Sequence, residues 1–193
     1  MIHAKPARSV SAVLKGRWLL AAALLAAAPA LHAETYLTPF VGAAFSGDTD
    51  DSRLTYGGAL AWAGESGVLG FEIEFAHTPD FFGTTGVGNN NVTTLMANLM
   101  LLSPGQVRIY GSGGVGLLRT RVEDVSGFFE IDSNNFGLNV GGGVLLFPGE
   151  SIGLRGDVRY FRNLTDPEPD DEFDIELGGL NYWRASGGVV LRF

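Results

Sequence analysis

The sequence predicts an all-β fold in which eight antiparallel strands follow one another and close into a barrel. Three observations support this prediction. Apolar residues recur at every second position in eight stretches, which is the pattern of strands whose successive side chains point to opposite faces. Turns rich in glycine, proline and serine separate many of these stretches. Glycine is abundant, with 28 of 193 residues, and no stretch after residue 33 has the length of a membrane-spanning helix.

Residues 1–33 are predicted to form a cleavable signal peptide, which leaves residues 34–193 as one barrel domain. An apolar run from Trp18 to Ala28 follows four basic residues, Lys5, Arg8, Lys15 and Arg17. Leu31-His32-Ala33 offers a small-residue cleavage site, and Ala28-Pro29-Ala30 is a second candidate. The run is too short to cross about 30 Å of hydrocarbon, so we expect removal rather than a membrane anchor.

The composition is that of an exported, apolar protein without disulfides. The chain is 46% hydrophobic, its mean hydropathy is +0.17, and it contains no cysteine. Four of its 13 basic residues precede residue 34, whereas all 21 acidic residues follow residue 33, so the mature net charge is −12. This charge argues against nucleic-acid binding. We expect no cofactor and no metal.

The predicted strands can be taken in order along the chain. They cover residues 35–45, 54–63, 68–77, 92–102, 107–119, 135–147, 152–162 and 180–193. In the third, Leu69, Phe71, Ile73 and Phe75 alternate with Gly70, Glu72, Glu74 and Ala76. Glycines at 113, 114, 116, 141–143, 187 and 188 interrupt later strands, where they make room for bulky inward neighbours and permit curvature.

The connections alternate in predicted length. Short turns at 64–67, 103–106 and 148–151 alternate with longer segments at 46–53, 78–91, 122–134 and 163–179. Membrane barrels have short periplasmic turns and long extracellular loops. In a β-sandwich or a soluble lipocalin-like barrel, short and long connections are not expected to alternate in this way. Aromatic residues gather near both strand ends, as in interfacial girdles: Tyr36, Trp62, Phe147 and Phe193 near the short turns, and Tyr56, Phe75, Phe136, Tyr160 and Trp183 near the long loops.

The last strand alternates up to the final residue, where Phe193, Leu191 and Val189 share one face. In this feature the chain resembles the small eight-stranded outer-membrane β-barrel proteins of Gram-negative bacteria, of the OmpX type and the membrane half of OmpA. The resemblance implies localisation in the outer membrane. It also implies that the assembly machinery reads these three residues as a signal, and that outer-membrane lipid and lipopolysaccharide are partners.

Charged residues occupy the face opposite the apolar one, in the middle of several strands. They are predicted to form a lumen charge network: Glu72, Glu74, Arg108, Arg155, Asp157 and Arg159. They either plug the lumen as ion pairs or line a narrow polar path. We favour the plug, because eight strands enclose only enough space for side chains to fill.

Other motifs give weaker indications. Gly111–Gly116 matches G-x-G-x-x-G, but a strand follows it where nucleotide binding needs a helix. His77 would need a neighbouring nucleophile to act in lipid modification, and Pro79 stands two residues on. The acidic segment 166–176 either gathers divalent cations or is a solvated loop, and we favour the loop.

We therefore expect an integral outer-membrane protein, without enzyme activity, that has a structural or surface-interaction role and displays acidic loops. The alternative is a narrow passive pore for small solutes or ions, and the remote one is a lipid-modifying enzyme. We expect a monomer without a peptidoglycan-binding domain.

Overall fold

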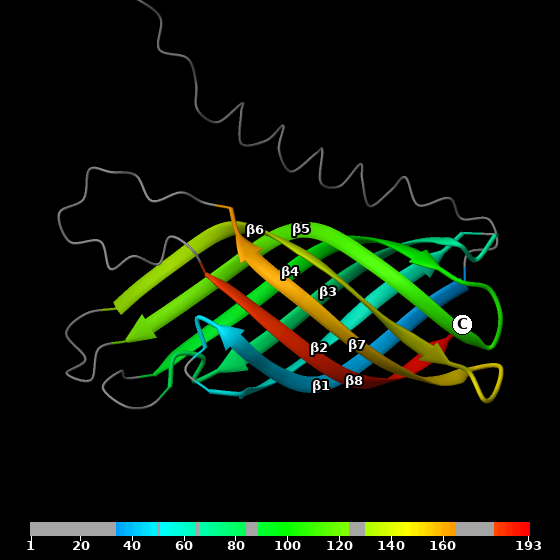
Figure 1. Ribbon diagram of the computed structural model, residues 1–193, viewed down its shortest axis with the longest axis horizontal. Helices are drawn as coiled ribbons and strands as arrows, with labels where there is room; N and C mark the ends of the chain where they lie inside the picture. The colour runs from blue at the N-terminus through cyan, green and yellow to red at the C-terminus, as the bar shows by residue number, and fades with distance from the viewer. Residues whose placement is uncertain (1–33, 50, 65, 84–88, 124–129, 165–179) are drawn as a thin grey trace, which may run out of the picture. The chain divides into compact units, whose positions relative to one another are not determined.

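The strands form a single closed barrel (Figure 1). The computed structural model describes residues 34–49, 51–64, 66–83, 89–123, 130–164 and 180–193. The strands are β1 (Glu34–Gly47), β2 (Arg53–Ala63), β3 (Leu69–Pro79), β4 (Asn90–Leu102), β5 (Val107–Glu123), β6 (Glu130–Leu146), β7 (Ile152–Asn163) and β8 (Asn181–Arg192). Each strand pairs antiparallel with its neighbours in sequence, and β1 pairs with β8 to close the barrel. The predicted fold class is confirmed.

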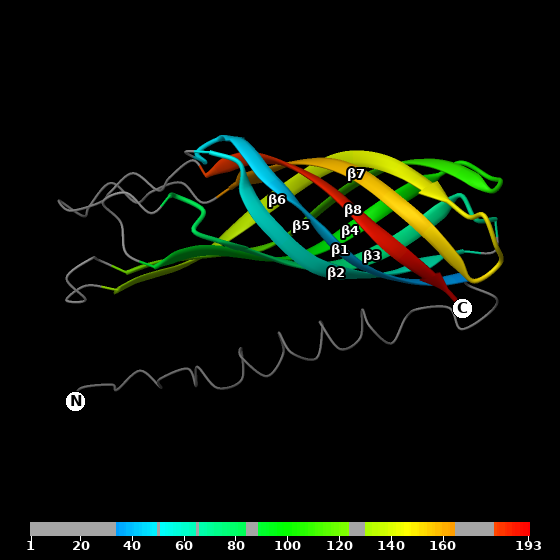
Figure 2. The same ribbon diagram turned by 90° about the horizontal axis from the view of Figure 1, so that it is seen from below.

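Closure brings the two ends of the barrel domain together. Leu37 lies opposite Leu60 of β2 and opposite Leu191 of β8. Past the last strand, Thr35 and Phe193 exchange backbone hydrogen bonds of 3.3 and 3.0 Å. Figure 2 shows β1 and β8 side by side along the barrel wall. The seam therefore carries hydrogen bonds to the last residue of the chain.

The period-two pattern fixes which side chains face outward. In β4, Leu99 is 63% exposed whereas its neighbour Asn98 is completely buried. In β3, Phe71 and Phe75 are exposed, and Glu72 and Glu74 between them are buried. The barrel is thus the inverse of a soluble one, with apolar residues outside and charged residues inside. Among the described residues, no helix is long and apolar enough to cross a membrane.

Two predicted long loops are shorter than expected, because the strands continue past the apolar band. β5 extends to Glu123 and β6 begins at Glu130, so the predicted loop 122–134 shrinks to residues 124–129. The β1–β2 connection covers only 48–52, the same length as the turn at 64–68. The alternation of long and short connections therefore fails there. Beyond the predicted strand ends, polar pairs such as Thr120 opposite Ser133 interrupt the alternation of apolar residues. The predicted strands were therefore too short.

Two residues of the predicted aromatic girdle face the lumen instead of lipid. Tyr36 and Phe147 are each 4% exposed, and their ring centroids lie 5.8 Å apart. Their height in the barrel was predicted correctly, near the short turns, but their face was wrong. Both stand next to outward leucines, Leu37 and Leu146, so alternation turns them inward.

Inward glycines make room for the large side chains of the lumen. A Cβ atom at Gly141 would lie 2.3 Å from the carbonyl oxygen of Val158 and 2.7 Å from Cγ of Arg159. At Gly111, which faces outward, a Cβ atom would meet nothing within 4 Å. The same residue type therefore has a packing role at one site and none at the other.

This contrast gives a testable prediction. Gly141→Ala should destabilise the barrel by about 1–3 kcal/mol, because the added methyl group overpacks the lumen. Gly111→Ala should be neutral or stabilise it by up to about 1 kcal/mol, because alanine loses less backbone entropy. Denaturant unfolding of both variants in the same detergent measures the difference. Equal effects of the two substitutions would contradict the packing role of Gly141.

Candidate functional site: the lumen charge network

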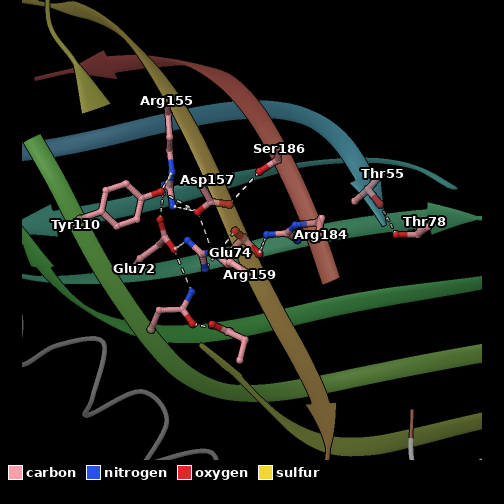
Figure 3. A network of polar contacts seen from close by, with 12 residues as sticks. Thr55, Glu72, Glu74, Thr78, Tyr110, Arg155, Asp157, Arg159, Arg184 and Ser186 are labelled. Atoms are coloured by element: carbon pink, nitrogen blue, oxygen red, sulfur yellow. Dashed lines mark hydrogen bonds and ion pairs between the residues drawn. The ribbon is translucent and has the colours of Figure 1, made fainter. Parts of the chain in front are cut away.

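Six charged side chains meet in the middle of the lumen (Figure 3). Alternation turns them inward from three strands: Glu72 and Glu74 from β3, Arg155, Asp157 and Arg159 from β7, and Arg184 from β8. None of the six side chains is more than 9% exposed. Three guanidinium groups thus stand against three carboxylates, and the network is electrically balanced.

Arg159 is the hub of this network. Its Nη2 atom lies 2.7 Å from Oε1 of Glu72, its Nε atom 2.8 Å from Oδ2 of Asp157, and its Nη1 atom 3.4 Å from Oε2 of Glu74. One guanidinium group therefore contacts all three carboxylates. Because Arg159 has no exposed surface, these contacts replace the water that the cation loses.

Arg155 and Arg184 extend the network on either side of Arg159. Arg155 contacts Glu72 at 2.5 Å and Asp157 at 3.0 Å. Arg184 contacts Glu74 at 2.7 Å, and its guanidinium carbon lies 4.9 Å from the ring centroids of both Phe40 and Phe161. The two aromatic faces stabilise this cation where water is excluded.

Neutral polar side chains donate further hydrogen bonds to the carboxylates. The Tyr110 hydroxyl donates to Asp157 at 2.7 Å and accepts from Nε of Arg155 at 2.7 Å. The Ser186 hydroxyl donates to Asp157 at 3.0 Å, and the Asn98 amide donates to Glu72 at 3.0 Å. These bonds fix the carboxylate orientations, so the network is held in one arrangement.

Arg108 lies apart from the network in which the sequence analysis placed it. As the second residue of β5 it lies near the short turns, where its Nη1 atom contacts Glu34 at 2.9 Å. It also donates to the Tyr36 hydroxyl at 2.7 Å and to the Gly105 carbonyl at 3.1 Å. The alternation of the strand correctly placed the Arg108 side chain on the inward face. Alternation shows which face a side chain occupies, but it does not show how far along the barrel axis the side chain lies.

Apolar side chains fill the lumen on both sides of the charges. At the short-turn end they form a lower cluster: Tyr36, Ala61, Ala63, Met100, Leu102, Tyr110, Leu145, Phe147 and Val190. At the long-loop end they form an upper cluster: Ala44, Phe81, Val92, Met96, Leu118, Phe161, Leu180 and Tyr182. The described lumen is therefore layered, with an apolar layer above and below the charged one.

Phe81 enters the upper cluster from a connection that was predicted only as a loop. Its side chain has no exposed surface, and its ring meets Tyr182 edge-on at 5.0 Å. The Asn90 amide holds the backbone that carries it, accepting from Phe82 N–H at 2.8 Å and donating to the Gly83 carbonyl at 2.7 Å. Loop composition gave no signal for this insertion.

His77 does not contact a charged group in any described interaction. It faces outward at the long-loop end, where its Nδ1 atom lies 2.9 Å from Oγ1 of Thr93 and its ring lies 5.6 Å from that of Tyr56. No group of three or more metal-ligating side chains occurs in the described part of the chain. The acidic segment 166–176 lies outside the described residues.

The proposed assembly residues occupy the lipid side of the closing strand. Phe193 is 77% exposed and Val189 is 44% exposed, while Leu191 is half-buried against its neighbours. Deleting Phe193 removes the two backbone hydrogen bonds to Thr35 and one apolar lipid contact. We expect a lower folded, heat-modifiable fraction in outer membranes, measured by gel mobility. An unchanged folded fraction would remove the reason to regard this end as an assembly signal.

Comparisons with known proteins agree with this architecture. The family model described as "Outer membrane protein beta-barrel domain" matches residues 18–193. Neisserial surface protein A is 14% identical, with 83% of this chain and 97% of that chain covered and a TM-score of 0.60. Yersinia pestis Ail, solved with the heparin analogue sucrose octasulfate, is 15% identical, with coverage of 84% and 100% and a TM-score of 0.57. No curated protein sequence matches the chain.

Structural similarity at such low identity shows the fold, and the family model shows the membership. The outward apolar face and the closed antiparallel barrel are what a membrane-spanning protein built of strands requires, because lipid meets apolar side chains and every strand is paired. The chain belongs to the outer-membrane protein β-barrel domain family, and the protein resides in the outer membrane of the cell.

Proposed function

We propose that this protein is a sealed outer-membrane barrel with a structural and surface-interaction role. The observation that carries the proposal is the layered lumen, in which a balanced charge network lies between two apolar clusters. Its activity would then reside at the outer surface and in the loops. We also propose that the barrel acts as a monomer and that the assembly machinery is its partner during insertion.

Sealing follows from the energetics of the three layers. An ion crossing the lumen would have to separate Arg159 from carboxylates in a place without bulk water, which is costly. It would also have to pass the aromatic rings of Phe161 and Tyr182, which stack 4.9 Å apart in the upper cluster. Either barrier alone opposes a passive pore.

Liposome swelling tests the proposal against the pore alternative. Vesicles containing the refolded protein should swell in iso-osmotic arabinose no faster than vesicles without protein. A general porin in the same lipid is the positive control, and gel mobility reports the folded fraction. Swelling that scales with the amount of folded protein would favour the narrow pore.

A further inference from the structure

The Phe81 ring enters the upper cluster from outside the strands. Phe81 belongs to the connection between β3 and β4, whereas most other members of the cluster belong to strands. Its ring has no exposed surface, and its centroid lies 5.0 Å from that of Tyr182. Tyr182 in turn stacks on Phe161, with the two ring centroids 4.9 Å apart. The barrel wall therefore offers an aromatic face to a ring that a connection supplies.

The turn that carries Phe81 is fastened to the first residue of β4. The carbonyl of Asn90 accepts a hydrogen bond from the Asp80 N–H at 2.7 Å, and the Asn90 side chain bonds the backbone of Phe82 and Gly83. Asp80 has a φ of 50°, a left-handed conformation that is costly for a residue other than glycine. Because these bonds join the turn to one residue, the ring can withdraw while the strands remain paired.

A buried hydroxyl group without a partner lies among the side chains of the upper cluster. Thr94 stands between Val92 and Met96 on the inward face of β4, and both of these neighbours belong to the cluster. Its register partner in β5, Leu118, belongs to it as well. Thr94 is 2% exposed, and among the described residues no group forms a hydrogen bond with its Oγ1 atom. A polar atom in this situation costs free energy until something bonds to it.

Arg184 adds buried donors beside the same cluster. Its Nη2 atom donates to Glu74, but its Nε and Nη1 atoms have no hydrogen-bond partner in the described part of the chain. Its guanidinium carbon lies 4.9 Å from the ring centroid of Phe161, a member of the cluster. A ligand that carries an acceptor oxygen would satisfy such groups. Because the charges of the network already balance, a neutral ligand fits better than an anion, whose charge would be buried without a counter-charge.

We propose that the upper cluster is a binding site for a small neutral aromatic alcohol of the phenol class, and that Phe81 competes for this site from within the chain. The ligand ring replaces the Phe81 ring against Tyr182, and the ligand hydroxyl bonds to Thr94. The ligand enters and leaves at the long-loop end, and the charge network beneath it stays closed. The proposal thus goes beyond the sealed barrel, and binding can fail or succeed whether or not the lumen conducts ions.

Methyl NMR of the refolded barrel in detergent micelles tests the proposal. Residues 34–193 contain two methionines, Met96 in the upper cluster and Met100 in the lower cluster. In protein with isotope-labelled methionine methyl groups, phenol should shift the Met96 signal to a plateau and leave the Met100 signal unchanged. Amide exchange at Phe82 should accelerate with phenol, because withdrawal of the turn breaks the bond to Asn90. Benzoate at the same concentration should have little effect on the Met96 signal.

Equal shifts of the two methionine signals, or a Met96 shift that grows without a plateau, would show general partitioning and overturn the site. A plateau at Met96 without faster exchange at Phe82 would overturn the replacement of Phe81. An equal response to benzoate would overturn the assignment to a neutral ligand.

Three variants separate the parts of the site. Phe81→Ala should bind phenol at least about tenfold more tightly than the wild type, because the competing ring is gone. Phe82→Ala is the matched control: it removes a ring from the same turn that packs against the cluster from outside, and it should keep the wild-type affinity. Thr94→Val should weaken phenol binding about fivefold and leave benzene binding unchanged, because it removes one hydrogen bond.

Gel mobility reports the folded fraction of each variant. Equal affinities of Phe81→Ala and Phe82→Ala for phenol would overturn the competition. An unchanged phenol affinity in Thr94→Val would overturn the role of the hydroxyl group. The wild type and Thr94→Val both retain the Phe81 ring, so they test the site even if Phe81→Ala does not fold.

Discussion

Replacing Arg159 with alanine should lower the free energy of unfolding by about 3–5 kcal/mol, the range for breaking a buried ion pair. The substitution leaves Glu72, Glu74 and Asp157 without their shared cation, and the first of these has no exposed surface. Denaturant unfolding in detergent micelles, followed by gel mobility, measures the change.

The matched control is Arg162→Ala, which removes an exposed arginine from the outer face of the same strand. Its cost should not exceed about 1 kcal/mol. In a second control, Arg184→Met and Glu74→Met should be less damaging together than the sum of the single changes, since the pair removes both charges. Similar small effects of Arg159→Ala and Arg162→Ala would show that the network contributes nothing to stability.

Leu99→Arg should destabilise the folded barrel in lipid by about 2–4 kcal/mol, because it places a charge near the bilayer midplane. Leu99 is 63% exposed and lies near the middle of the outward apolar residues of β4, which run from Leu95 to Leu101. Leu101 is equally exposed but lies near the short-turn end of the same strand.

Leu101→Arg should therefore cost only about 0–1 kcal/mol, since arginine near the interface reaches headgroups and water. Both variants replace leucine with arginine. A difference between their free energies of unfolding in the same vesicles therefore reports the depth of the residue in the bilayer. If Leu101→Arg costs as much as Leu99→Arg, the assignment of β4 across the bilayer is wrong.

The fold could be predicted from the sequence because it depends on local periodicity. Outward leucines and phenylalanines alternate with inward polar residues, as Phe71 and Glu72 do. This alternation defines the strands and their approximate spans, and the charges in mid-strand show which face is inward. The predicted strand ends were less accurate where apolar residues no longer recurred at every second position. β5 and β6 continue as a paired, mostly polar ribbon to Glu123 and from Glu130, and the single apolar pair in it, Val122 opposite Ile131, does not make an alternating pattern.

The interior of the barrel was less predictable, because contacts there depend on height and on register between distant strands. Glu72 and Arg159 are 87 positions apart and meet only because β3 and β7 face each other across the lumen. Arg108 shares their parity but not their height. Phe81 enters from a loop, where no periodicity applies, and it closes a layer that sequence patterns did not indicate.

Arg184 and Tyr110 belong to the network, although the predicted set of six residues did not contain them. Both occupy inward positions of their strands, so alternation places them in the lumen. Tyr110 contacts Asp157 at 2.7 Å, and Arg184 contacts Glu74 at the same distance. The alternation placed both side chains on the inward face, and Arg184 is one of the mid-strand charges there. The predicted network of six residues nevertheless included neither, because alternation does not show which side chains of distant strands meet.

The most direct measurement of the central claim is ionic current through single refolded proteins in a planar lipid bilayer. If the balanced network and the two apolar clusters seal the lumen, folded protein should add no discrete current steps to the bare bilayer in molar potassium chloride. Stable, reproducible steps whose frequency follows the amount of folded wild-type protein would contradict the seal.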